Sequence, residues 1–138
     1  MPDSNPYSSK EAWVATLHSA FNGPQEQVES TFLRLYTKET VIKMDGKTYD
    51  WEAFMAHVAW IRDIASNIEI KSHCFLRDGN MLADKHTLTA TMKNDAPEVV
   101  VEAYLFGELD DDGKAAWVDE QARTLGQPGA AAEKPETV

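Results

Sequence analysis

The sequence lacks the features that mark several large classes of protein. It contains a single cysteine, Cys74, in 138 residues, so no internal disulfide can form. Its apolar runs are only a few residues long, whereas a membrane-spanning helix needs roughly 20 residues. The polar N-terminal stretch "MPDSNPYSSKEAW" has no apolar core of the kind that a secretory signal carries. We therefore expect a cytoplasmic protein that does not enter the membrane.

Positive charge and metal-binding motifs are also scarce. The chain has 13 Lys and Arg against 23 Asp and Glu, a formal net charge of −10, and no basic cluster. Since nothing could neutralise a run of phosphates, we expect no nucleic acid or anionic membrane as a partner. The chain has no Gly-rich phosphate loop and no His-x-x-x-His or Cys-x-x-Cys motif, so neither a metal nor another cofactor is expected. Its histidines are scattered at His18, His57, His73 and His86.

The first 40 residues predict two helices. Ser8 and Glu11 have the spacing of a capping box, and apolar residues then recur at helical spacing until Gly23. A second apolar stripe predicts a helix over residues 25–38. Residues 1–7 precede these signals, and we expect them to be flexible.

A short hairpin and a third helix follow. Asp45-Gly46 lies between two short β-like stretches and is typical of a tight hairpin turn. Asp50 has the position of a helix cap, and the stretch "WEAFMAHVAWIRDIA" after it carries an apolar stripe at helical spacing. Arg62 in this helix is a candidate to bind a substrate oxyanion, but such an arginine more often pairs with a surface acid.

After residue 66 the apolar period changes to two, which predicts strands. Four strands separated by short turns are expected over residues 67–76, 81–92, 98–109 and 115–125. Residues 126–138 are rich in Gly, Pro, Ala and Glu, and we expect them to be disordered. The prediction is an α+β domain over residues 8–125, in which a curved antiparallel sheet packs on three N-terminal helices.

The order of these elements resembles the SnoaL-like family of the nuclear transport factor 2-like superfamily. The resemblance is carried by "MDGKTYDWEAFMAHVAWIRD", the hairpin and helix, and by "FLRDGNMLADKHTLTATM", the turn and long central strand. It implies a cone-shaped sheet, a four-strand meander plus a short hairpin, with a pocket at its open end. The superfamily includes isomerases, dehydratases, polyketide and terpenoid cyclases, and members without activity, so the resemblance implies a fold more than a function.

Two polar residues stand on the apolar face of the strand "MLADKHTLTATM". Asp84 and His86 are two positions apart, so both side chains point to the same face, about 7 Å apart at Cα. A neighbouring carboxylate raises the pKa of a histidine and selects its tautomer, which suits it to take a proton next to a carbonyl. The alternatives are a buried structural hydrogen bond or a polar strand end facing water.

The partners of this pair depend on the strand register. A type I turn with a bulge pairs Leu76 with Asn80 and places Ser72 opposite Asp84, and we prefer it because apolar residues then face apolar residues. A type I′ turn places His73 opposite Asp84 instead. On the next strand Tyr104 becomes a pocket neighbour and proton donor only if its mixed face joins His86. On the last strand the choice between the face of Glu120 and the face of Asp119 stays open.

The predicted site combines these groups with the helix after Asp50. His57 flanks its apolar stripe, so it faces His86 across the cavity or is an ordinary boundary histidine. We expect the aromatic side chains of this helix to belong to the hydrophobic core, and one of them is also a candidate to form a flat wall against a ligand. The predicted catalytic residues are His86, Asp84, His57 and Tyr104. The predicted ligand-binding residues are Trp51, Phe54, Trp60, Leu88 and Phe106.

We therefore predict a small-molecule pocket protein that works without a cofactor. The leading hypothesis is an acid/base isomerase, cyclase or dehydratase, and the substrate is a polyketide-, terpenoid- or steroid-like compound that is apolar and carries a carbonyl group. A homodimer through the outer face of the sheet is expected. The alternative is a non-catalytic ligand-binding or dimerisation module of the same fold.

Overall fold

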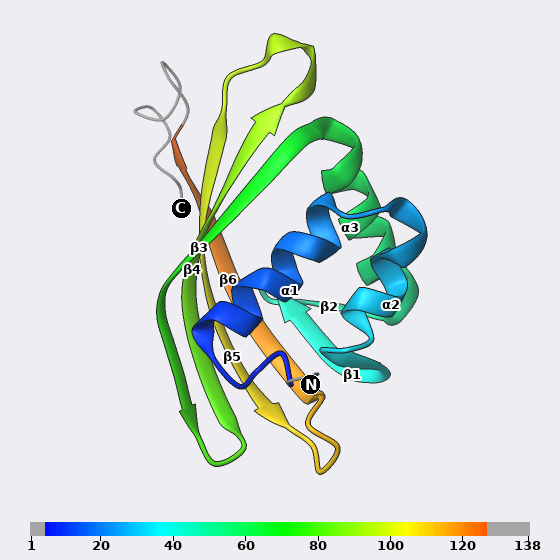
Figure 1. Ribbon diagram of the computed structural model, residues 1–138, viewed down its shortest axis with the longest axis vertical. Helices are drawn as coiled ribbons and strands as arrows, with labels where there is room; N and C mark the ends of the chain where they lie inside the picture. Colours follow the sequence, from blue (N-terminus) through cyan, green and yellow to red (C-terminus); the bar gives the residue numbers. More distant parts are fainter. Residues whose placement is uncertain (1–4, 127–138) are drawn as a thin grey trace.

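Helices cover one face of a curved, unclosed sheet in the computed structural model, which describes residues 5–126 (Figure 1). The predicted disordered tail lies outside the described residues, apart from residue 126. The helices are α1 (Lys10–Asn22), η1 (Gln25–Gln27), α2 (Val28–Phe32), α3 (Trp51–Ile64) and η2 (Lys93–Asp95), where η marks a 3₁₀ helix. The strands are β1 (Tyr36–Met44), β2 (Lys47–Tyr49), β3 (Ala65–Asp78), β4 (Met81–Met92), β5 (Val99–Leu109) and β6 (Ala115–Gly126).

The sheet joins the hairpin β1–β2 to the meander β3–β6. The order of its six strands is β2-β1-β6-β5-β4-β3, and β1 runs parallel to β6 while every other pair is antiparallel. The predicted α+β fold, with hairpin and meander, is therefore confirmed, and the parallel pair makes the sheet mixed. Within residues 5–126 no helix is both long enough and apolar enough to cross a bilayer.

Side-chain caps define the ends of the two longer helices. The hydroxyl of Ser9, and not that of Ser8 as predicted, accepts a hydrogen bond from Ala12 N at 3.0 Å and begins α1. The predicted cap of α3 is confirmed, because Asp50 Oδ1 accepts from Ala53 N at 2.8 Å. Both caps satisfy backbone N–H groups that have no partner within their own helix.

The predicted second helix is too long. The chain forms one 3₁₀ turn and then α2, which ends at Phe32, and β1 begins at Tyr36. Leu35 and Tyr36 are both buried, but Leu35 lies in the turn after α2 and Tyr36 is the first residue of β1, so neither belongs to a helix. Pairing of β1 with β6, from the far end of the chain, overrides the local helical pattern.

Aromatic side chains fill the space between the helices and the sheet. The ring centroid of Phe32 lies 5.1 Å from that of Phe54 and 6.1 Å from that of Tyr36. Tyr7 stacks on Trp13 at 5.5 Å, and its hydroxyl donates to Leu35 O at 2.8 Å. Tyr7 is fully buried, so the packed part of the chain begins before the predicted boundary at residue 8.

Arg62 fastens α3 to the C-terminal end of α1. Its guanidinium donates from Nη1 to Ala20 O at 2.8 Å and from Nη2 to Gly23 O at 2.7 Å. These carbonyls lie at the negative end of the helix dipole, where a cation is favourable. Arg62 thus has a structural partner that is neither a substrate oxyanion nor a surface acid, and it helps to hold the two helices over the sheet.

Candidate functional site

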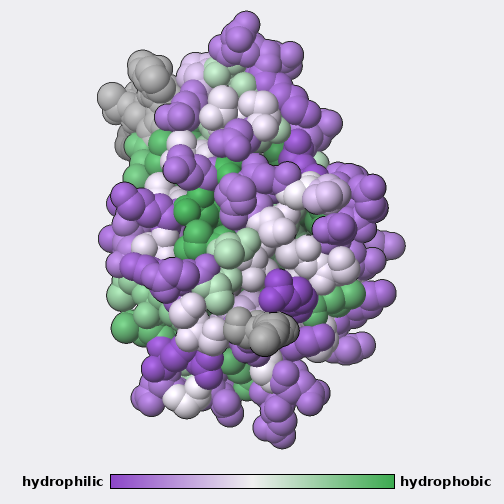
Figure 2. All heavy atoms as spheres, viewed as in Figure 1, coloured by the Kyte–Doolittle hydropathy of each residue, from purple (hydrophilic) through white to green (hydrophobic). Residues whose placement is uncertain are grey.

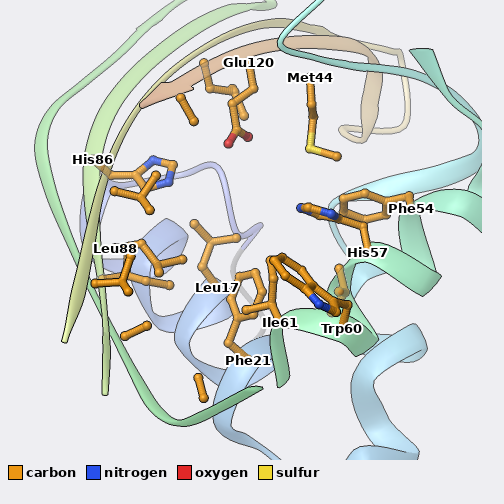
Figure 3. A pocket seen from close by; sticks show the side chains of 18 of the residues that line it. Leu17, Phe21, Met44, Phe54, His57, Trp60, Ile61, His86, Leu88 and Glu120 are labelled. Atoms are coloured by element: carbon orange, nitrogen blue, oxygen red, sulfur yellow. The ribbon is translucent and has the colours of Figure 1, made fainter. Parts of the chain in front are cut away.

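A cavity of about 590 Å³ lies between the inner face of the sheet and the helices α1 and α3 (Figure 3). Its volume is within the range of small-molecule sites. The wall is mostly apolar, with side chains from three directions: Leu17 and Phe21 from α1, Phe54, Val58, Trp60 and Ile61 from α3, and Ile70, Leu88, Val101 and Leu105 from the sheet. The ionisable groups in the wall include His57, His86 and Glu120.

Three polar residues on the inner face form one hydrogen-bonded chain. Ser72 Oγ donates to Asp84 Oδ1 at 2.7 Å, and His86 Nδ1 lies 2.5 Å from Asp84 Oδ2. All three residues are buried, with exposed fractions of 8%, 4% and 6% respectively. Each oxygen of the Asp84 carboxylate therefore has a donor, which is what a buried charge requires. Of the three, His86 is the one that lines the cavity.

The register that brings these residues together differs from both predicted alternatives. The turn is two residues long and pairs Asp78 with Met81, and an irregularity in β3 follows Ser72. Ser72 pairs with His86 in consequence, and its hydroxyl still reaches Asp84 along the diagonal. A bulge adds one residue to one strand, so no count from the turn could have given this register. His73 faces the outer side, as the preferred register implied, where its Nε2 lies 2.5 Å from Thr87 Oγ1.

The environment of His86 leaves one ring nitrogen, Nε2, available to accept a proton. Burial lowers the pKa of His86, but the hydrogen bond and charge of Asp84, together with the charge of Glu120, raise it above the ordinary histidine value. The carboxylate accepts from Nδ1–H, which leaves the lone pair on Nε2. Among residues 5–126 no side chain forms a hydrogen bond with Nε2, so a ligand in the cavity can use it.

Glu120 is the residue of this site that the sequence left open. The pairing of β5 with β6 turns Val118, Glu120 and Ala122 inward, and the Glu120 carboxyl points into the cavity (Figure 3). Burial raises the pKa of Glu120 above the ordinary glutamate range, with the charges of Asp45 and Asp84 acting in the same direction and His86 opposing them. Alternate residues of β6 point to opposite faces of the sheet, and no turn signal in the sequence showed which set points inward. This choice decides whether the Glu120 carboxyl faces the ligand or the solvent.

His57 lines the cavity from the opposite wall. Its ring lies between those of Tyr49 and Trp60, with centroid distances of 5.8 and 6.0 Å. Burial lowers the pKa of His57, and the nearby charge of Asp45 only partly offsets this, so the ring is neutral at pH 7. A neutral imidazole here can donate or accept one hydrogen bond. The predicted position across the cavity from His86 is thus the position found (Figure 3).

Two predicted site residues on β5 lie outside the cavity. His86 pairs with Ala103, so the inner face of β5 carries Ala103 and Leu105, and the mixed face points outward. Tyr104 is 39% exposed and contacts Lys85, whose Nζ lies 5.5 Å from the ring centroid. Phe106 is 56% exposed on the same outer face. The prediction that these two residues meet a ligand in the pocket is corrected by this register.

The remaining predicted ligand-binding residues divide in a similar way. Phe54, Trp60 and Leu88 line the cavity. Trp51 packs beside Phe54 at the start of α3 and donates from Nε1 to Glu29 Oε2 at 2.8 Å, away from the cavity wall. Within residues 5–126 no three His, Cys, Asp or Glu side chains are grouped as metal ligands would be.

Solved structures with this architecture come from several bacteria. IdmH from Streptomyces antibioticus, a provisionally assigned polyketide cyclase, has a TM-score of 0.65 at 13% identity, covering 88% of this chain and 92% of that chain. A provisionally assigned isomerase from Rhodopseudomonas palustris has 0.67 at 14% identity, covering 86% and 93%. A SnoaL-like polyketide cyclase from Agrobacterium tumefaciens has 0.58 at 13% identity, covering 81% and 87%.

These likenesses establish the fold. The chain has the cone-shaped α+β fold of solved structures described as NTF2-like and as a SnoaL-like polyketide cyclase, which is the fold that the sequence resemblance implied. No protein-family model matches the chain, and no curated protein matches its sequence. Proteins that share this fold at so low an identity need not share an activity. The function is therefore argued from the site.

The raised pKa of Glu120 predicts a pH-dependent effect on stability. The folded protein holds this proton more tightly than the unfolded chain, so wild-type stability falls as the pH rises from the ordinary glutamate range through the raised pKa. Glutamine carries no such charge. We expect Glu120→Gln to raise the Tm relative to wild type, and to do so more at pH 8 than at pH 5, in thermal unfolding followed by circular dichroism.

The matched control is Glu69→Gln, which changes an exposed carboxyl on the outer face of β3. Its Tm difference from wild type should be small at both pH values. A Glu120→Gln difference that is the same at pH 5 and pH 8 contradicts the raised pKa.

Proposed function

We propose that this protein is a cofactor-independent enzyme that moves a proton on a small apolar molecule next to a carbonyl group. The observation that carries the proposal is the chain Ser72–Asp84–His86, which is buried in an apolar wall and opens to the cavity at a single unpaired nitrogen. A buried and internally satisfied polar chain that ends at an apolar cavity is suited to bind and activate a ligand.

The proton transfer requires only groups that the site contains. His86 Nε2 takes a proton from the carbon beside the carbonyl, and the electron pair of that C–H bond moves toward the carbonyl oxygen. Asp84 stabilises the imidazolium that forms, and Ser72 holds the carboxylate in place through Oδ1. Return of the proton to another carbon of the substrate completes an isomerisation, and no atom or electron is left over.

The walls of the cavity favour an apolar substrate. Phe54, Trp60 and Leu88 offer flat or branched apolar surfaces, and His57 offers one polar group opposite His86. This composition suits a polyketide-, terpenoid- or steroid-like compound with few polar groups. Solved proteins of this fold include ones named as polyketide cyclases and as an isomerase, which supports this class of chemistry for the cavity.

The base can be tested without knowing the natural substrate. In D₂O the α-hydrogens of 2-tetralone, a small bicyclic ketone, exchange for deuterium when a base removes them, and NMR follows the exchange. We expect the wild-type protein to accelerate this exchange over buffer, and His86→Ala to reduce the acceleration about 100-fold or more, because general base catalysis contributes about that factor.

Two further variants separate catalysis from folding. His73→Ala removes an imidazole from the outer face of the neighbouring strand and should leave the exchange unchanged. Asp84→Asn keeps the size of the side chain, but its amide can donate to Nδ1 and hold His86 in the tautomer with a proton on Nε2, so exchange should fall. If wild type binds 2-tetralone without accelerating exchange, the protein is the alternative, a ligand-binding module.

We also propose that the outer face of the sheet pairs two copies of the chain. Leu76, Ala83 and Phe106 lie in one row across β3, β4 and β5, and Met81 lies beside them. Leu76, Met81 and Phe106 are exposed there, and Figure 2 shows apolar side chains among charged ones along the sheet side of the molecule, at the left of the view. An exposed apolar row of this kind is favourable when covered.

Sedimentation velocity tests this pairing. Wild type should sediment with twice the mass of one chain, and Phe106→Glu should sediment as a monomer, because a charge cannot be buried without a partner. Ala15→Glu, an apolar-to-charged change on the exposed side of α1, is the control and should leave the mass unchanged. A monomeric wild type contradicts the proposed dimer.

A further inference from the structure

Glu120 stands beside His86 in the curved sheet. Asp84, Leu105 and Glu120 pair in one row across β4, β5 and β6, and His86 pairs with Ala103 in the next row on the same face. Strands lie about 4.8 Å apart and the two rows are offset by two residues along the strand, so Glu120 and His86 are separated by roughly 12 Å at Cα. Toward β5 and β6, the neighbours of His86 in its own row are Ala103 and Ala122, whose small side chains leave space above the sheet between the imidazole and the Glu120 carboxyl.

The Glu120 carboxyl has no hydrogen-bond or ion-pair partner in the part of the chain that the structure describes. Among residues 5–126 no side chain or backbone group forms a hydrogen bond or ion pair with it, although it points into the cavity (Figure 3). It shares this end of the cavity with Met44, across from His57 on α3. A polar group that is aimed into an apolar cavity and left without a partner is a place where a ligand atom can bind.

The charges that act on Glu120 are mostly negative. Asp84 on β4 and Asp45 in the turn after β1 repel its charged form, and His86 is the one nearby group that attracts it. Tyr36 on β1 faces the same region with its pKa raised, so it is neutral there. Arg123, the residue after Ala122 on β6, bonds through its guanidinium to Glu102 on the outer face, so its charge is paired there.

We propose that Glu120 binds the carbonyl oxygen of the ligand as a hydrogen-bond donor, and that it thereby restricts the cavity to neutral oxygen groups. This inference rests on the proposed function and assigns the carbonyl oxygen of the ligand to Glu120 and the neighbouring carbon to His86. Burial raises the pKa of the Glu120 carboxyl, which favours its neutral, proton-bearing form. A ketone oxygen can accept the proton of that acid without bringing a new charge into the apolar wall.

A ligand carboxylate should bind less favourably in this cavity than a ketone does. It would lose its hydration near the negative charges of Asp84 and Asp45, and the imidazole of His86 is already bonded to Asp84. An added charge in such a site is unfavourable because it is desolvated without a partner of its own. The site should therefore discriminate strongly between a ketone and a carboxylate of the same shape.

The same placement divides the proton transfer between two residues. While His86 Nε2 takes the proton from the α-carbon, the O–H bond of Glu120 breaks and its proton moves to the carbonyl oxygen, which gives a neutral enol, an imidazolium and a Glu120 carboxylate. The total charge of the site is unchanged. In the return step the enol gives its proton back to Glu120, and the imidazolium delivers its proton to carbon.

Two probes of the same shape test the selectivity by calorimetry at pH 7. They are 2-acetonaphthone, a neutral methyl ketone, and 2-naphthoate, in which a carboxylate oxygen replaces the methyl group. We expect wild type to bind the ketone at least tenfold more tightly than the carboxylate. Equal affinities, or a preference for the carboxylate, overturn the proposal without any variant.

Substitution of Glu120 separates its role from that of its neighbours. Glu120→Gln keeps a hydrogen-bond donor and is neutral, as Glu120 is in the proposal, so the ketone and naphthoate affinities should both change less than about threefold at pH 7. Glu120→Ala removes the donor and should weaken ketone binding at least tenfold. Glu69→Gln on the outer face should change neither affinity.

The outcomes also distinguish this proposal from the proposed function. If wild type accelerates exchange of 2-tetralone but Glu120→Ala binds the ketone as tightly as wild type does, the role of Glu120 is wrong and the base stands. If the selectivity and the weaker ketone binding of Glu120→Ala are found without exchange, Glu120 recognises the oxygen in a protein that only binds the ligand. If His57→Ala weakens ketone binding and Glu120→Ala does not, His57 binds the oxygen and the proposal fails.

Discussion

The site depends on a constraint on the inner face of the sheet: a carboxylate buried there must have all of its hydrogen bonds made by neighbours on the same face. Asp84 meets this requirement through Ser72 on one oxygen and His86 on the other. Leaving either oxygen unpaired in an apolar wall would be unfavourable by an amount comparable to a lost charged hydrogen bond, about 1.5–3 kcal/mol. The positions of β3 and β4, and the orientation of the imidazole, follow from satisfying this one group.

The curvature of the sheet turns this polar chain into a site. The helices α1 and α3 cover the concave face, and Arg62 joins them, but the packed aromatic side chains do not fill the cone to its open end. His86 and Glu120 reach the cavity from the sheet, and His57 reaches it from α3 (Figure 3). An apolar cavity with ionisable groups on two walls lowers the free energy of unfolding of the protein. Such an arrangement is typical of sites that bind a ligand.

Local signals in the sequence predicted much of this arrangement. The Asp50 cap, the Asp45-Gly46 turn and the alternation around His86 each depend on residues close together in the chain, and the structure contains all three. The parallel pairing of β1 with β6, the irregularity after Ser72 and the inward face of β6 depend on partners far away in the sequence. For that reason Glu120 was left open, whereas Asp84 and His86 were placed on one face from their spacing alone.

The central claim is that Asp84 holds the His86 ring with a proton on Nδ1 and a free lone pair on Nε2 facing the cavity. A ¹⁵N NMR titration of the histidine side chains, with His86 assigned by its loss in His86→Ala, tests this directly. The account predicts a protonated Nδ1 and an unprotonated Nε2 in the neutral ring, and a pKa above the ordinary histidine value. A neutral ring with its proton on Nε2, or an ordinary or lowered pKa, would contradict it.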